Sequence, residues 1–112
     1  MTNEEKRKHQ RIDSLNLSYL CLDENHQVVK QGMGRTLNLS ESGILLETYF
    51  PINAEHTVLL SMGLEENLVE VRGRPVYARS KEQGVYEVGI EFLDPDETVI
   101  ETIRNYLSSP EA

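Results

Sequence analysis

The sequence contains one cysteine, no tryptophan and no long hydrophobic run, and these shortages exclude several classes of protein. Cys21 has no second thiol in the chain with which to form a disulfide. The apolar runs are far shorter than the ~20 residues that a transmembrane helix requires. The first ten residues are almost wholly polar, unlike a secretory signal. The sequence therefore predicts a cytoplasmic protein that does not insert directly into a membrane.

Positive charge is also scarce. Eleven lysines and arginines stand against 19 acidic residues, so the formal net charge is -8. General binding to nucleic acid requires many basic side chains that neutralise phosphates, and this composition argues against it. An anionic ligand would have to be bound by a local basic patch. The length of 112 residues and the hydrophobic content of 38% predict a single folded domain.

The sequence contains few features typical of an enzyme or of a metal site. The acidic clusters Glu65–Glu66 and Asp94–Glu97 each have a structural use, as a loop and as a helix start. The segment Gly32–Gly34 lacks the third glycine and the following helix of a dinucleotide fingerprint. No spacing typical of a metal motif relates the three histidines, His9, His26 and His56. We therefore expect neither an enzyme, nor a metal site, nor a bound cofactor.

Alternation of apolar and polar residues predicts six short strands. They are expected at residues 15–21, 28–39, 44–48, 57–62, 68–77 and 85–92. The pattern is clearest in the last, where Tyr86, Val88, Ile90 and Phe92 are expected to face inward. In the second strand, one face is expected to carry Met33, Arg35, Leu37 and Leu39.

A helix is predicted after the last strand. Asp94 is expected to be its N-cap and Pro95 its first residue, and residues 108–110 are expected to end it. Its apolar stripe consists of Val99, Ile100, Ile103, Tyr106 and Leu107.

The chain is therefore predicted to be all-β, a six-stranded antiparallel β-barrel with a C-terminal α-helix. Its parts are a basic arm (1–11), the barrel (12–93) and the helix (94–109).

Two polar segments stand out from this framework. Arg7 and Arg11 are four residues apart, and planar guanidinium groups suit phosphate contact and base stacking. The run Asn38–Gly43 has the spacing N-x-S-x-x-G, which predicts a tight turn in which Asn and Ser side chains bond to backbone amides and Gly supplies a positive φ.

Together these segments resemble the PilZ domain family. Residues 7–11 match its R-x-x-x-R motif, and residues 38–43 match its [D/N]-x-S-x-x-G motif. Residues 86–92 are similar to its closing strand, with the ending Gly-Ile-x-Phe. The resemblance extends from residue 6 to about residue 92. It implies the same barrel with a C-terminal helix and, as the ligand, cyclic di-GMP, a bacterial second messenger.

The resemblance also implies the ligand-binding residues. It assigns cyclic di-GMP binding to Arg7, Arg11, Asn38, Ser40 and Gly43. Further contacts are expected from Lys6, Lys8 and Tyr77, the last by stacking on a base. Since Lys6 stands before Arg7, the ligand stoichiometry is left open between one molecule and an intercalated pair.

A non-catalytic receptor is the function that these features imply. Cyclic di-GMP would order the arm 6–11 onto the barrel, and an unidentified partner protein in motility, adhesion or exopolysaccharide (biofilm) machinery would read the changed surface. The alternative is a protein-interaction adaptor that has the same fold but binds no nucleotide.

Overall fold

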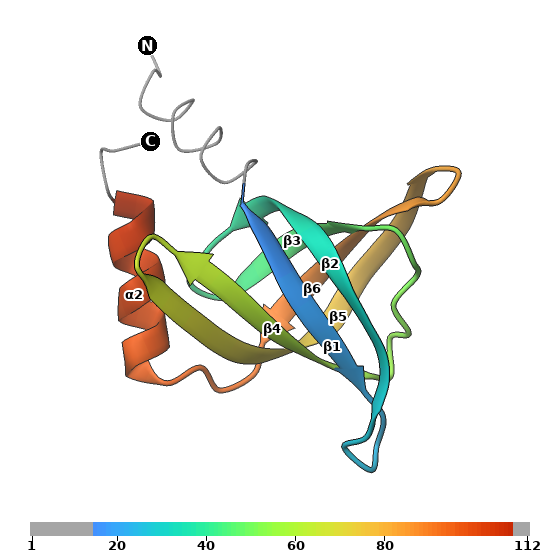
Figure 1. The fold of residues 1–112 in the computed structure, drawn as a ribbon, viewed down its shortest axis with the longest axis horizontal. Helices are drawn as coiled ribbons and strands as arrows, with labels where there is room; N and C mark the ends of the chain where they lie inside the picture. The colour runs from blue at the N-terminus through green and yellow to red at the C-terminus, as the bar shows by residue number, and fades with distance from the viewer. Residues whose placement is uncertain (1–14, 109–112) are drawn as a thin grey trace.

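Within residues 15–108, which the structure describes, six antiparallel strands close into a barrel and one helix packs against it. The protein is seen here in a computed structural model (Figure 1). The elements are β1 (Asn16–Leu22), β2 (Val28–Leu39), β3 (Gly43–Thr48), β4 (Thr57–Leu64), β5 (Asn67–Glu82), β6 (Val85–Phe92) and α2 (Glu97–Ser108). Around the barrel the order is β1-β2-β3-β6-β5-β4. The predicted fold class is thus confirmed.

The barrel interior is filled by every second residue of the strands, as a period of two requires. In β1 these residues are Leu17, Tyr19 and Cys21, and in β6 they are Val88, Ile90 and Phe92, all buried. Tyr86, expected to face inward, is only half-buried because it lies near the end of β6. Burial raises the pKa of the Cys21 thiol, which favours its role as a small core residue over a reactive one.

The expectation for β2 is wrong in one respect. Its pairing with β3 shifts between Thr36 and Asn38, so Leu37 is an extra residue in a bulge. Before the bulge Gly34 and Thr36 face the core, and Met33 is 61% exposed. After the bulge Leu39 is buried. The four residues expected on one face therefore lie on two faces, because one inserted residue reverses the alternation.

Strand β5 is longer than expected and pairs with a different neighbour along each of its halves. Its first half pairs with β4 and its second half with β6, and Gly73 pairs with both Val58 and Phe92. The pairing with β6 shifts between Pro75 and Tyr77, which places the proline beside a bulge as its missing N–H requires. The β5–β6 hairpin extends beyond the barrel (Figure 1), and it turns through Gln83 and Gly84.

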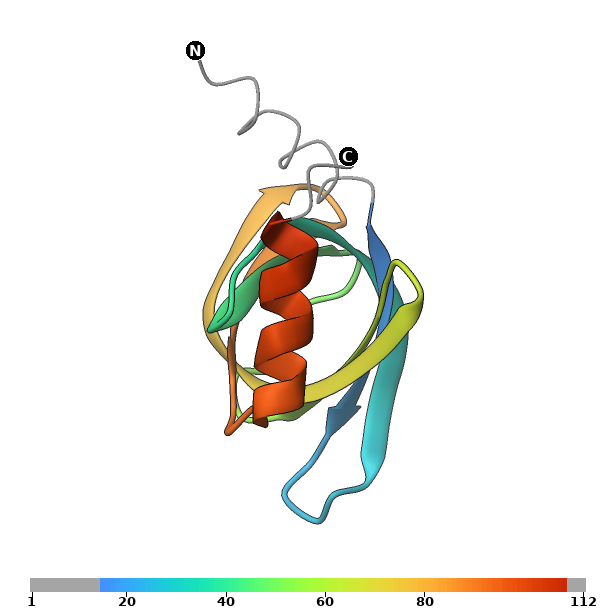
Figure 2. The same ribbon diagram turned by 90° about the vertical axis from the view of Figure 1, so that its left-hand side faces the viewer.

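Helix α2 begins two residues later than expected. The carboxylate of Asp96 accepts a hydrogen bond from the Val99 amide at 3.0 Å, so Asp96 is the N-cap, whereas Asp94 has a positive φ of 44° and lies before the helix. Ile103 and Tyr106 are buried against the barrel. Figure 2 shows the helix lying across one end of the barrel, beside β4 and β5.

Candidate functional site

The turn between β2 and β3 is held by Ser40. Its hydroxyl oxygen accepts hydrogen bonds from the amides of Ser42 and Gly43, each at 3.2 Å, and its own amide donates to the Gly43 carbonyl at 2.9 Å. The Ser42 carbonyl accepts from the Phe92 amide at 2.9 Å. The turn is therefore fixed both internally and against β6, and it presents its polar atoms at a defined place.

Gly43 is required here for a different reason from the one that its sequence context suggests. Its φ is not positive, and Gly84 is the one glycine in the described residues with that conformation. Instead, an added Cβ at position 43 would lie 2.5 Å from the carbonyl oxygen of Ile90. The absence of a side chain allows β3 to approach β6 closely at the base of the turn.

A surface pocket of about 410 Å³ lies beside this turn. Its lining comes from the turn, from β3 and from the facing parts of β5 and β6: Asn38, Leu39, Ser40, Ser42, Gly43, Ile44, Leu45, Val76, Gly89, Ile90 and Glu91. The volume falls in the range of small-molecule sites. Three residues that the sequence singled out, Asn38, Ser40 and Gly43, thus line one hollow.

Cross-strand pairing explains the composition of the outer face around this pocket. One row across β3, β6 and β5 contains Gly43, Glu91 and Arg74, and the next contains Leu45, Gly89 and Tyr77. Glycine at two of these positions lets the Ile90 backbone and the Tyr77 side chain pack closely against them, and the pocket surface beside them is largely apolar. A flat aromatic ring could lie there with polar groups at its edges.

Tyr77 lies next to the pocket rather than in its lining. Its Cβ would be 3.2 Å from a Cβ added at Gly89, so the ring stands over that glycine, and it is 48% exposed. The residue before it, Val76, lies in the bulge between Pro75 and Tyr77 and lines the pocket instead. A role of Tyr77 in stacking stays a prediction. Sequence reasoning missed Val76 because the position of a bulge is decided by strand pairing.

A row of charges borders the apolar centre on its other side. Glu47 is nearly buried and accepts hydrogen bonds from Arg35 at 3.1 Å and from Lys81 at 3.0 Å. Its neighbour Glu87 pairs with Arg79 at 3.1 Å. The hydrogen bond from Lys81, followed by that from Arg35, lowers the pKa of the Glu47 carboxyl against the effect of burial. This network ties β2, β3, β6 and β5 together.

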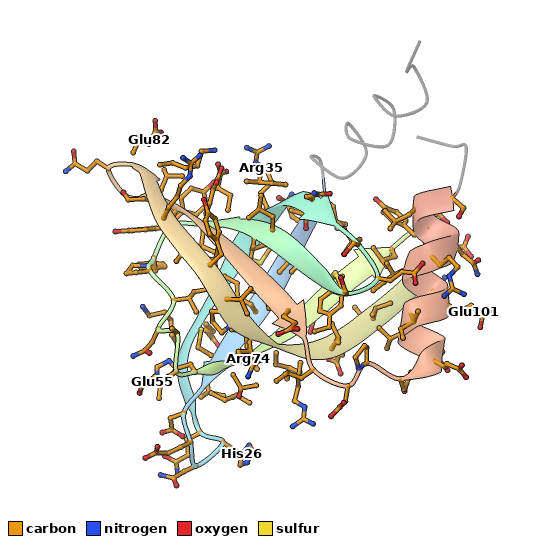
Figure 3. All side chains as sticks on the ribbon, turned by 180° about the vertical axis from the view of Figure 1, so that it is seen from behind. His26, Arg35, Glu55, Arg74, Glu82 and Glu101 are labelled. Atoms are coloured by element: carbon orange, nitrogen blue, oxygen red, sulfur yellow. The ribbon has the colours of Figure 1, made fainter. Side chains whose placement is uncertain are left out.

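Arg74 forms a separate ion pair with Glu91, with 3.0 Å between the Arg74 Nη2 and Glu91 Oε1 atoms. In the view of Figure 3 the labelled side chains of Arg35 and Arg74 lie well apart. The strand pairing places the row Leu45–Gly89–Tyr77 between the Glu91–Arg74 pair and the Glu47–Glu87 row. Sequence reasoning did not select Glu91, because an acid at an outward position of a strand is an ordinary surface residue unless a pocket forms beside it.

The turn is also joined to the C-terminal helix. Arg104 of α2 donates two hydrogen bonds to the carboxylate of Glu41, at 3.0 and 3.1 Å. This bond lowers the pKa of the Glu41 carboxyl. Both side chains are about half exposed. The pair places α2 beside the turn, although 63 residues separate the two partners in the chain.

The basic residues of the predicted site, Arg7 and Arg11 with Lys6 and Lys8, lie outside the described residues. The described part of the chain begins just before β1. The Leu15 carbonyl accepts a hydrogen bond from the Thr36 amide at 2.9 Å, so the chain enters the barrel two residues from Asn38 along β2.

A profile of the PilZ domain matches residues 5–109, nearly the whole chain. The chain belongs to the PilZ domain family. Members of this family are in general receptors for cyclic di-GMP and are ligand-binding domains rather than enzymes. The match includes both motifs and α2, and it confirms the resemblance seen in the sequence.

A solved PilZ structure has a similar fold. It is the PilZ domain of CeSA from a cellulose-synthesising bacterium, with a TM-score of 0.56 and 14% sequence identity, and the alignment covers 86% of this chain and 92% of that one. At this identity the likeness supports the shared fold alone. A search of curated proteins found no significant match.

Two further properties of the described residues bear on function. No helix in residues 15–108 is long and apolar enough to cross a membrane. In the same part of the chain, no three side chains of His, Cys, Asp or Glu are grouped so that they could hold a metal ion.

Proposed function

We propose that this PilZ domain is a cytoplasmic receptor for cyclic di-GMP, which binds in the pocket beside the Ser40 turn. The observation that carries the proposal is the convergence of Asn38, Ser40 and Gly43 on one hollow of about 410 Å³. These residues border a largely apolar surface, to which Leu45 and Val76 contribute, and they supply hydrogen-bonding groups at its edge. Such a surface suits a purine with a phosphate attached.

The positive charge that two phosphates require is assigned to the arm. The only charged residue among the described lining residues is the acid Glu91, and the protein as a whole is acidic. Arg7 and Arg11 would supply guanidinium groups that pair with phosphate or stack on guanine. Lys6 and Lys8 would add charge. The described chain begins at Leu15, whose carbonyl accepts a hydrogen bond from the Thr36 amide, two residues before Asn38 of the pocket lining.

Ligand binding would then change the surface of the protein. The bound nucleotide would hold residues 6–11 against the turn, and a partner protein would recognise the combined surface. Contact between the Ser40 turn and α2 through Glu41 and Arg104 places the helix beside this surface. We expect the partner to be a protein of the motility, adhesion or exopolysaccharide machinery, as the resemblance to the family implies.

Isothermal titration with cyclic di-GMP tests the proposal, with GMP and cyclic di-AMP as ligand controls. We expect saturable binding that is specific for guanine, and the stoichiometry will distinguish one bound molecule from an intercalated pair. The variant with Arg7→Ala and Arg11→Ala should lose binding. The control Arg72→Ala removes a guanidinium group on the side of β5 that faces Asp94 and Asp96 and should bind normally.

Absence of heat with the wild-type protein at tens of micromolar ligand would contradict the proposal and favour the adaptor. Normal binding by the double arginine variant would show that the arm is not part of the site. In both cases the melting temperature of the free protein should be compared, to confirm that each variant is folded.

A further inference from the structure

Glu91 occupies an unexpected place for a site that binds a dianion. It is the one charged residue among the described residues that line the pocket. It pairs across the strands with Gly43 on one side and with Arg74 on the other, so its side chain stands on the outer face next to the Ser40 turn. A carboxylate in this position repels phosphate, and hydrogen bonds that it accepts from another part of the ligand would offset this cost.

Guanine offers donors of the required kind. Its N1–H and its 2-amino group are adjacent and point in the same direction, and the two oxygens of one carboxylate can accept from both. Adenine presents an acceptor and a donor at the corresponding edge and cannot form this pair of bonds. The lining otherwise provides neutral groups such as Asn38 and Ser40, which do not require two donors.

We propose that Glu91 is a specificity-determining residue that binds the Watson–Crick edge of one guanine of cyclic di-GMP. The inference rests on the proposed function and adds the residue that selects the base. Leu45 and Val76 make the pocket surface beside the carboxylate apolar, and the Tyr77 side chain packs over Gly89 at its border. A purine lying flat there would direct one edge toward Glu91.

Arg74 is the positioning residue of this arrangement. Its guanidinium donates to Glu91 Oε1 at 3.0 Å, and a carboxylate has about four lone-pair directions, so this bond leaves capacity for guanine donors. Arg74 also compensates the negative charge of Glu91 near the phosphates. The pair restricts the carboxylate to the edge of the pocket, which reduces the entropy lost when the ligand binds.

The test compares Glu91→Gln with the wild-type protein in titrations with cyclic di-GMP and with its inosine analogue, cyclic di-IMP, which lacks the 2-amino group. The wild type should prefer the guanine ligand. Glu91→Gln should bind cyclic di-GMP about tenfold more weakly, the effect of one lost charge-assisted hydrogen bond, and should bind the two ligands alike. Arg74→Gln should reduce the same preference to a smaller extent.

The charge-matched control is Glu70→Gln, on the half of β5 that pairs with β4. Long-range electrostatics alone predicts that removal of an acid tightens the binding of a dianion, so Glu70→Gln should bind slightly more tightly, in the direction opposite to Glu91→Gln. Unchanged or tighter binding by Glu91→Gln, or an unchanged preference for guanine over inosine, would overturn the inference and leave the receptor function intact. No binding of cyclic di-GMP by the wild type would overturn both.

Discussion

Replacement of Gly43 by alanine tests the most specific packing requirement at the site. A Cβ at this position would lie 2.5 Å from the carbonyl oxygen of Ile90 and 3.5 Å from the Cα of Glu91. The first distance is about 1 Å shorter than an ordinary van der Waals contact. Because the obstructing atom belongs to the backbone of β6, it cannot rotate away as a side chain would.

The cost follows from what must move. To relieve the contact, β3 must separate from β6, and the bonds that fix the turn, including that from the Phe92 amide to the Ser42 carbonyl, must lengthen. Overpacking of this kind typically costs about 1–3 kcal/mol, and we expect the upper half of that range. For a domain of this size, ~2 kcal/mol lowers the melting temperature by about 8–16 °C.

The matched control is Gly63→Ala. Gly63 also lies in a strand, β4, but no atom lies within 4 Å of a Cβ added there. Alanine at this position should be neutral or slightly stabilising, since it restricts the unfolded chain. Urea unfolding followed by circular dichroism, with calorimetry, measures both variants. Equal unfolding midpoints for the two would show that β3 can leave β6 without cost, and the reasoning about Gly43 would be refuted.

Two further predictions concern the turn and the charged row beside the pocket. Ser40→Ala removes the acceptor of the Ser42 and Gly43 amides. It should lower the free energy of unfolding by about 0.5–1 kcal/mol and weaken cyclic di-GMP binding in titration. The control Ser42→Ala should leave the turn intact, and equal binding by the two variants would argue against the role of Ser40. The folded-state pKa of Glu47 is lowered from 4.5, so its contribution to stability is present above about pH 4.5 and is lost as the pH falls through the folded-state value. Glu47→Gln should destabilise the protein at pH 7 by about 1–2 kcal/mol. The variant should also lose less unfolding free energy than the wild type between pH 5 and 3, as measured by urea unfolding at each pH. An unchanged dependence of stability on pH would show that Glu47 is not the group responsible.

Much of the barrel could be predicted from local sequence. Regular alternation in β1 and β6 identifies the inward residues, because side chains of a strand point to opposite faces in turn and one face must be buried. The amphipathic period of α2 likewise places Ile103 and Tyr106 on its buried side. The two motifs identified the family, and they selected three residues that the fold brings to one pocket.

Tertiary structure decided the features that depend on pairing between distant segments. The bulge at Leu37 places Met33 and Leu39 on opposite faces. The alternation of residues in β2 does not predict this bulge, because it is defined by the register against β3. The choice of Asp96 over Asp94 as N-cap depends on where the chain leaves β6 to reach the end of the barrel. Gly43 is a further example. The sequence shows that residue 43 has no side chain, but the reason that none fits there, the close approach of the Ile90 carbonyl from β6, is visible only in the folded structure. Val76 and Glu91 become pocket residues for this reason too, since a pocket is formed by strands that the sequence keeps apart and the fold brings together.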